Sequence, residues 1–319
     1  MLPSRARVDR QGTDLRRQGW YGLKAPVKRL LSWRVPHLVL RQVVRLVPPR
    51  DGIGRLPAPA RLREVEGRIG DLRFVMLNPA RCEIAKELYW GGGRRPRPED
   101  ALAMEVFAAL APRADVVLDV GAYTGVFTLV AAAANPGARI HAFEIVPEVY
   151  KALLDNLVRN DVLSRVTPHL EGIGEPGREM RIATGAGGSA LPSFYSSRMR
   201  FEGGPHVRFR SLDSLLGELR AGRTLVKIDV EGTEEAVFRH GQRFLAERRP
   251  DVLCEVLAGV ADPGRLEALL APHGYRYFRV AEAALEARPR IDPHARFRDW
   301  LFTTAPPERL AELGLPLGA

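Results

Sequence analysis

Residues 116–125 read VVLDVGAYTG, an apolar run followed by an aspartate and then by two glycines four positions apart. The apolar run has the composition of a buried strand, and the stretch VFTLVAAAA at 126–134 predicts a helix directly after the loop. A glycine loop between a strand and a helix presents backbone N–H groups at the carboxyl end of a doubly wound sheet, where nucleotide-like ligands bind. The stretch therefore predicts a ligand-binding turn in an α/β domain.

The rest of the chain continues this alternation of strands and helices. Further apolar strands are predicted at 138–145, 165–173, 224–230 and 251–257, with helices at 147–160, 233–247 and 263–274. Strands without polar alternation are buried on both faces, which requires a parallel sheet covered by helices on each side. Two last strands, at 275–280 and 299–305, are joined by a Pro- and Arg-rich loop. The expected fold is a Rossmann-like, doubly wound α/β sheet, mostly parallel, with an antiparallel C-terminal edge strand.

Composition divides the chain into three parts. Residues 1–60 are rich in Arg and Pro and form a basic N-terminal extension and linker. Residues 61–110 form a lead-in, with a β unit that turns at Gly70-Asp71 and two helices, and we expect this part to pack on the core. Residues 111–319 form the ligand-binding domain.

The net charge of +10 originates in the N-terminal extension. Residues 1–50 hold 12 Lys and Arg against two Asp, so the other 269 residues hold 36 basic and 36 acidic side chains. Residues 27–47 show a basic amphipathic helical pattern that is interrupted at Pro36. We favour a helix packed on the domain with a solvated cationic face. The alternative is peripheral contact of residues 27–47 with an anionic membrane.

Two features favour a cytoplasmic protein. Cys82 and Cys254 are far apart, and neither belongs to a CxxC or Cys/His cluster, which is typical of a reduced compartment. The apolar stretch 35–47 is broken by Arg41 and Arg45, so it predicts neither a secretory signal nor a membrane span.

The glycine loop departs from both common phosphate-binding motifs. Tyr123 stands where the dinucleotide motif needs its middle glycine, and no Gly-Lys-Ser/Thr follows Gly125. Asp119 at the entrance of the loop suits a ligand with a cationic amino group, and Glu144 stands 25 residues later, where a carboxylate accepts hydrogen bonds from ribose hydroxyls. Together they favour S-adenosylmethionine, although helix capping by Asp119 and a solvated strand end at Glu144 remain alternatives.

From about Ile84 to Thr304 the chain resembles the FkbM-type S-adenosylmethionine-dependent methyltransferases. The resemblance lies in LDVGAYTGVFTL (118–129), AFEIVPEVYKALLDNLVRN (142–160), VRFRSLDSLL (207–216) and VKIDVEGTEEAVFRHGQRFLAERRPDVLCEV (226–256). Tyr123, Ile145 and His240 depart from the usual residues of that pattern. The resemblance implies a class I methyltransferase domain over residues 111–319. The expected cofactor-binding residues are Asp119, Gly121, Ala122, Tyr123, Gly125, Glu144, Gly172 and Ile173.

Three carboxylates are candidates for the chemistry: Asp229, Glu231 and Glu255, which end the strands at 224–230 and 251–257. Clustered carboxylates are costly unless they share a proton, a cation or a substrate hydroxyl. They predict a general base for an acceptor hydroxyl; Mg²⁺ ligation is the alternative, and we do not expect a required metal. Helix capping remains open for Glu231, and we expect Lys227 to pair with a neighbouring carboxylate.

A long Gly- and Ser-rich loop at 184–206 precedes the strand that ends at Asp229. Loops of this length inside compact domains are often functional, so we interpret it as a substrate lid with contacts from Ser189, Tyr195 and His206.

The favoured function is O-methylation of a small-molecule or glycan acceptor: a sugar, a lipid-linked glycan or a secondary metabolite. The alternatives are an RNA methyltransferase and a catalytically degenerate, cofactor-binding scaffold recruited by the basic N-terminus. The chain lacks an NPPY-like motif, so we expect no nucleic acid partner.

Overall fold

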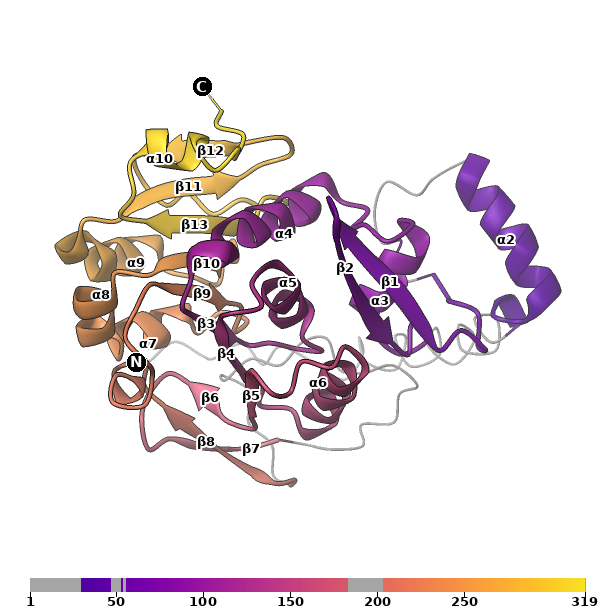
Figure 1. Cartoon of the computed structure of the whole chain (residues 1–319), viewed down its shortest axis with the longest axis horizontal. Coiled ribbons are helices and arrows are strands. Elements are labelled where there is room, and N and C mark those ends of the chain that lie inside the picture. Colours follow the sequence, from indigo (N-terminus) through magenta and orange to yellow (C-terminus); the bar gives the residue numbers. More distant parts are fainter. Residues whose placement is uncertain (1–29, 47–52, 54–55, 183–202, 319) are drawn as a thin grey trace, which may run out of the picture.

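A computed structural model of the chain describes residues 30–46, 53, 56–182 and 203–318. Its centre is an eight-stranded sheet in the order β12-β11-β13-β10-β9-β3-β4-β5 (Figure 1). Five neighbouring strands run parallel: β3 (Val116–Val120), β4 (Arg139–Phe143), β5 (Val166–His169), β9 (Thr224–Ile228) and β10 (Asp251–Glu255). This arrangement confirms the predicted Rossmann-like, mostly parallel sheet.

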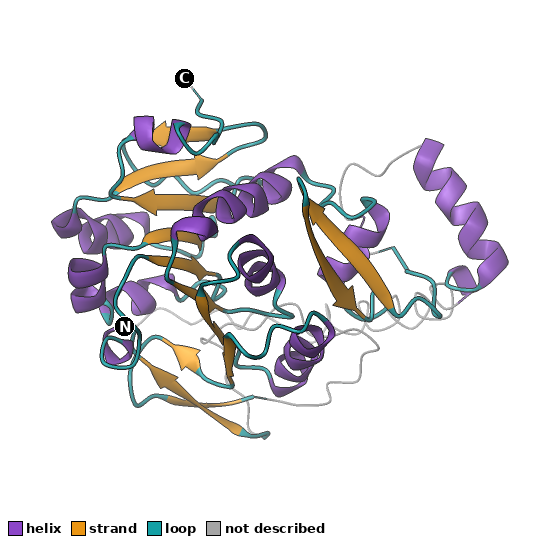
Figure 2. Cartoon of the chain, in the orientation of Figure 1, coloured by secondary structure: helices purple, strands orange, loops and turns teal. Residues whose placement is uncertain are grey.

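Helices cover both faces of the sheet (Figure 2). One face packs against α4 (Pro98–Leu110), α5 (Val126–Ala134) and α6 (Pro147–Arg159), and the other against α7 (Glu234–Arg239), α8 (Gln242–Arg248) and α9 (Pro263–Leu270). Successive side chains of a strand point to opposite faces. In β3, Val117 joins the first core, whereas Val116 and Leu118 join the second. Burial on both sides is the physical reason for the apolar runs in the sequence.

The antiparallel part of the sheet differs in detail from the prediction. It holds three strands: β11 (Arg276–Val280), β12 (Leu285–Arg288) and β13 (Asp299–Thr303). The last of them, β13, lies between β10 and β11, so the edge strand is β12, which the sequence did not indicate. Trp300 and Phe302 are fully buried, and such residues suit an interior strand. A short helix, α10 (Pro307–Ala311), follows.

Two other predictions are corrected. The predicted strand 165–173 ends at His169, and its last residues form β6 (Gly172–Ile173) in a separate sheet with β7 (Glu179–Arg181) and β8 (His206–Arg210). The predicted helix 233–247 divides into α7 and α8. Asp213 accepts a hydrogen bond from Phe244 N (2.8 Å), which caps the first turn of α8. Single-turn 3₁₀ helices occur at Ala111–Arg113, Asp213–Leu215 and Ala271–His273.

The lead-in lies beside α5 and α6. It comprises the hairpin of β1 (Glu64–Ile69) and β2 (Leu72–Leu77), then α3 (Glu83–Trp90) and α4. Asn160 of α6 bonds to both Val75 N and Val75 O of β2, at 2.8 and 2.7 Å. Asn156 accepts from Leu77 N and donates to Thr124 O, both at 2.8 Å. These side chains form hydrogen bonds with the edge of β2 that a neighbouring strand would otherwise make, and they connect the hairpin to the glycine loop.

Replacement of Asn156 by Leu is expected to lower the free energy of unfolding by about 2 to 3 kcal/mol, because the Leu77 N–H and the Thr124 carbonyl lose their partner. Urea denaturation measures the change. The exposed Asp155 on the same helix provides the control, since Asp155→Ala should stay within about 0.5 kcal/mol of the wild type. Equal losses in the two variants would contradict the bridging role of Asn156.

The N-terminal helix α2 (Arg34–Leu46) lies at the end of the molecule, beyond the hairpin (Figure 1). The helix is not interrupted at Pro36 as predicted, because this proline falls in the first turn, where its missing N–H costs no hydrogen bond. His37 is buried and its Nε2 lies 2.8 Å from the Tyr89 hydroxyl. The expected burial of the apolar face on the domain is wrong for Leu38, Val39 and Val43, which are exposed. Within the described ranges, no helix is long and apolar enough to cross a membrane.

Candidate active site

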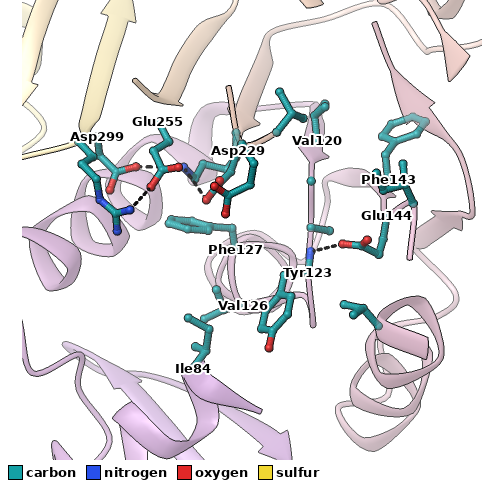
Figure 3. Close-up of a pocket in the computed structure, with 18 of the residues that line it drawn as sticks. Ile84, Val120, Tyr123, Val126, Phe127, Phe143, Glu144, Asp229, Glu255 and Asp299 are labelled. Carbon is teal, nitrogen blue, oxygen red and sulfur yellow. Dashed lines mark hydrogen bonds and ion pairs between the residues drawn. The ribbon is translucent and has the colours of Figure 1, made fainter. Parts of the chain in front are cut away.

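A cavity of about 800 Å³ opens at the carboxyl ends of β3, β4, β9 and β10 (Figure 3). Its lining comes from the loops that follow these strands, from the start of β13 and from the lead-in helices α3 and α4. The carboxyl edge of a parallel sheet is where ligands bind in doubly wound folds. The cavity thus contains the glycine loop on one side and the clustered carboxylates on the other.

The glycine loop is held against the backbone of the neighbouring strand. Gly121 has a φ of 81°, and a Cβ added there would lie 1.9 Å from the carbonyl oxygen of Asp229. Gly125 has a φ of 88°, and its added Cβ would meet Leu153 of α6 at 2.4 Å. Both positions therefore require glycine for conformation and for space. Gly121, Ala122 and Tyr123 line the cavity, whereas Gly125 lies behind it.

Glu144 lies at the end of β4 and faces the glycine loop across the cavity wall (Figure 3). Its carboxylate accepts hydrogen bonds from Tyr123 N (2.9 Å) and Val146 N (2.7 Å). Burial raises the pKa of Glu144 to about 7, against the lowering effect of these N–H donors. Each carboxylate oxygen keeps a further acceptor site, so Glu144 can bind hydroxyl groups of a ligand.

Asp119 has another role than the predicted contact with a ligand. Its carboxylate accepts from both the backbone N (2.9 Å) and the hydroxyl (2.6 Å) of Thr128, in the first turn of α5. Asp119 is 1% exposed and lies outside the cavity lining. The structure thus favours the helix-capping interpretation, because a buried carboxylate needs these donors. Gly172 and Ile173 do line the cavity.

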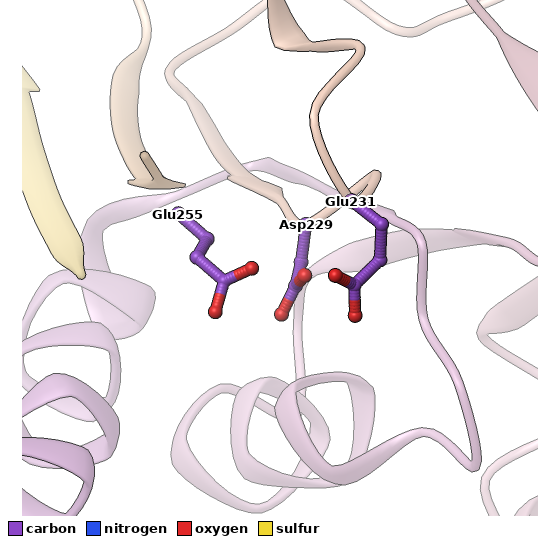
Figure 4. Close-up of side chains that lie close together, drawn as sticks. All are labelled: Asp229, Glu231 and Glu255. Carbon is purple, nitrogen blue, oxygen red and sulfur yellow. The ribbon is translucent and has the colours of Figure 1, made fainter. Parts of the chain in front are cut away.

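The three predicted catalytic carboxylates meet in space (Figure 4). Asp229, Glu231 and Glu255 each offer an oxygen, and the three atoms lie within 4.8 Å of one another. The backbone after β9 turns sharply here, since Glu231 has a φ of 53° and Gly232 a φ of 92°. Burial, and then the Asp229 charge, raise the pKa of Glu231 to about 7. The same two causes raise the pKa of Glu255, while Arg298 lowers it.

Two cations lie beside this cluster. Lys227 is 2% exposed, and its Nζ lies 3.0 Å from Asp299 Oδ1 and 3.7 Å from Asp229 Oδ2. The predicted pairing of Lys227 with a carboxylate is confirmed, and the ring of Phe127 covers the ammonium group at 5.0 Å. Arg298 pairs with Glu255 at 3.1 Å. The second oxygen of Glu255 is buried and has no hydrogen-bond partner among the described residues.

Sequence reasoning missed Arg298 and Asp299. Asp299 begins β13 and Arg298 directly precedes it; β13 runs antiparallel to β10, so the N-terminal end of β13 lies at the carboxyl end of the parallel strands. Asp299 is in register with Glu255. The sequence predicted β13 as an edge strand, and this prediction does not place the first residues of β13 beside Glu255.

The lead-in supplies a second charged group to the cavity wall. Arg95 is 13% exposed at its side chain and pairs with Glu87 of α3 at 2.6 Å and with Asp100 of α4 at 2.9 Å. All three residues line the cavity. A buried network of ion pairs therefore holds the loop between α3 and α4 in place beside the cavity.

Of the three predicted lid residues, His206 is the one that the structure describes. Ser189 and Tyr195 lie outside the described residues. His206 begins β8, is 51% exposed at its side chain and lies 3.4 Å from Glu179, away from the cavity lining. Phe209, on the buried face of the same strand, lines the cavity instead. The reason is strand alternation, which turns residues 206 and 209 to opposite sides.

Comparison with known proteins gives matches at the sequence level and the fold level. A family model described as the methyltransferase FkbM domain matches residues 119–277. A curated relative, the 31-O-demethyl-FK506 methyltransferase FkbM of Streptomyces tacrolimicus, is 50% identical over 52 residues, which are 16% of this chain and 20% of that protein. The match thus spans one fifth of the relative's length.

Two solved structures align with the chain at low sequence identity. The crystal structure of methyltransferase FkbM from Methylobacillus flagellatus KT aligns with a TM-score of 0.40 and 18% identity, over 60% of this chain and 43% of that one. TYW2 of M. jannaschii in complex with AdoMet aligns with a TM-score of 0.41 and 15% identity, over 76% and 86% of the two chains.

The family match coincides with the site described above. It begins at Asp119 and ends at Tyr277, so it includes the glycine loop, Glu144 and the carboxylates of the cluster. The segment also contains β3, β4, β9 and β10, whose carboxyl ends build the cavity. The chain belongs to the FkbM family of methyltransferases.

Proposed function

We propose that the protein is an S-adenosylmethionine-dependent O-methyltransferase that acts on a hydroxyl group. The observation that carries the cofactor assignment is Glu144, a carboxylate that faces the cavity beside the backbone of Ala122 and Tyr123. Gly121, Ala122 and Tyr123 line the cavity, so a nucleoside-containing ligand bound there would lie close to the main chain of the glycine loop. Glu144 would accept from the ribose hydroxyls, with Gly172 and Ile173 beside the adenine end.

The carboxylate cluster supports a hydroxyl acceptor. S-adenosylmethionine supplies an electrophilic methyl group, so the acceptor oxygen has to give up its proton. In our proposal the proton passes to a carboxylate oxygen of Glu231, whose pKa of about 7 suits a base near neutral pH. Asp229, whose Oδ2 lies 3.7 Å from Lys227 Nζ, orients the hydroxyl as a hydrogen-bond acceptor. The relative from Streptomyces tacrolimicus is named for a 31-O-demethyl substrate, which also supports methylation of oxygen.

The ion pairs that the clustered carboxylates form favour their role as a general base over a role as metal ligands. Two of the three carboxylates, Asp229 and Glu255, already lie beside Lys227 and Arg298. A divalent ion there would be placed close to two fixed positive charges, which oppose its binding.

The charge of the cavity favours an acceptor without negative charge, such as a neutral glycan, a neutral polyol or an acceptor that bears an amino group. Acidic residues outnumber basic ones among the described residues that line it. The acids are Glu83, Glu87, Asp100, Glu144, Glu171, Asp229, Glu231, Glu255 and Asp299, and the bases are Arg95, Arg97, Lys227 and Arg298. A phosphate-bearing acceptor would meet repulsion there, which argues against the RNA methyltransferase alternative.

Calorimetric titration with S-adenosylhomocysteine tests the cofactor assignment. We expect Glu144→Ala to weaken binding by roughly 10- to 100-fold, because hydrogen bonds to a charged group contribute about 1.5 to 3 kcal/mol. Asp155→Ala, on the exposed side of α6, is the matched control and should bind like the wild type. NAD⁺ should not bind. Failure of the wild type to bind S-adenosylhomocysteine would refute the proposal and favour the alternative of a catalytically degenerate scaffold.

A further inference from the structure

The helix α2 and the residues just before it expose several large apolar side chains. Nine large hydrophobic residues are exposed in the described part of the chain, and five of them lie within residues 30–43. They are Leu30, Trp33, Leu38, Val39 and Val43, each exposed by 53 to 61%. Contiguous exposed apolar surface of this kind marks an interaction site.

The apolar residues of α2 face away from the body of the protein. A helix turns by about 100° per residue, so Leu38, Val39 and Val43 lie on the side opposite to His37. His37 is the residue that contacts the body, through Tyr89 and the ring of Trp90 at 5.3 Å. The outward side is therefore free to meet a second, large surface.

One described basic residue borders this apolar side next to Leu38. Arg41 is exposed on the flank of the helix, and the first 50 residues contain 12 Lys and Arg against two Asp. A helix with an apolar side, a basic flank and a tryptophan near its start has the composition of segments that lie in the interface of anionic membranes. The same charge would repel a basic protein partner and gives no reason for self-association.

The contact between α2 and the body also connects this surface to the active site. Tyr89 and Trp90 end α3, and Ile84 and Glu87 of the same helix line the cavity. A surface bound by α2 would thus lie against the lead-in, whose helix α3 forms part of the cavity wall.

We propose that the outward side of α2, formed by Leu38, Val39 and Val43 with Arg41 beside it, is a docking surface for an anionic lipid bilayer. This inference does not depend on the proposed reaction. The apolar side chains enter the headgroup boundary, and the basic side chains bind the lipid phosphates.

Cosedimentation of the full chain with vesicles tests the proposal. The variant carries Val39→Gln and Val43→Gln; the matched control carries Val158→Gln and Leu163→Gln, which lie outside α2 and are exposed by 62% and 43%. Vesicles contain either phosphatidylcholine alone or a mixture with phosphatidylglycerol. We expect the wild type and the control to bind the anionic vesicles at least about tenfold more strongly than the neutral ones, and less at high salt. The α2 variant should lose at least about tenfold in partition coefficient.

Three results would overturn the proposal. The wild type could fail to bind anionic vesicles, or the α2 variant could bind as well as the control. Light scattering could also show a wild-type dimer that the α2 variant converts to a monomer, with no vesicle binding, which would assign the surface to contact between copies. Binding of S-adenosylhomocysteine by every variant verifies that the fold and the cofactor site are intact, independently of the membrane result.

Discussion

Replacement of Lys227 by Met is expected to lower the free energy of unfolding by about 3 to 5 kcal/mol, because it removes a buried cation and leaves charged carboxylates around a hydrophobic group. Lys227 is 2% exposed and lies 3.0 Å from Asp299 and 3.7 Å from Asp229. Burial lowers the pKa of its ammonium group, but Asp299, Asp229 and Glu255 outweigh burial and raise it, so the lysine is charged throughout the accessible range.

The stability lost when Lys227 is replaced by Met should increase as the pH rises. Lys227 lowers the pKa of Glu231 and of Glu255, so without it both pKa values rise further above their usual range in the folded state. A group with a raised folded pKa stabilises the fold below its unfolded pKa, and that contribution is lost as the pH rises through the folded value. The variant should therefore be more destabilised at about pH 8 than at about pH 5.

Urea denaturation at the two pH values measures this effect. The exposed Lys151→Met is the matched control, and it should remain close to the wild type. A second variant, Lys227→Met with Asp299→Asn, should recover part of the lost stability, since it removes one unpaired charge. An equal loss at both pH values, or no recovery in the double variant, would show that Lys227 acts by packing rather than by charge.

Replacement of the proposed base is expected to lower kcat by about 10² to 10⁴-fold while S-adenosylhomocysteine still binds, because only the proton transfer is lost. The variant is Glu231→Gln, with Asp229→Asn beside it. Release of S-adenosylhomocysteine, measured with a hydroxyl acceptor that supports wild-type turnover, gives the rates. Glu235→Gln is the control, since Glu235 pairs with Arg239 and Arg265 outside the cavity.

The pH profile of the wild type provides an independent readout. A base has to be deprotonated to act, and the pKa of Glu231 is raised to about 7 by burial and by the Asp229 charge. The rate should therefore rise up to about pH 7 and level off above it. If Glu231→Gln turns over normally and Asp229→Asn does not, the base is Asp229. Normal turnover by both variants would refute a carboxylate base in this cluster.

The parts of the site that could be predicted from sequence are those in which neighbours along the chain also lie together in space. The glycine loop is one continuous turn between a strand and a helix, so its residues could be placed from the sequence alone. The meeting of Asp229 with Glu255 also followed, because the carboxyl ends of adjacent parallel strands share one edge. Asp119 shows the limit of this reasoning. Its position beside the loop was predicted, but its Oδ2 accepts two hydrogen bonds from Thr128 and the residue is 1% exposed.

The sequence by itself determined the doubly wound fold, the family and the location of the binding turn. It did so because two-sided burial demands uninterrupted apolar strands, and a turn with positive φ and no room for a Cβ demands glycine at Gly121. Only the tertiary structure decided which charges share the site. Arg298 and Asp299 arrive there because β13 enters the sheet antiparallel beside β10, and Arg95 arrives through the packing of the lead-in. The interaction between two charges depends on the distance between them in space. Pairing of strands that are far apart in the sequence brings such charges together, and no local sequence pattern predicts these contacts.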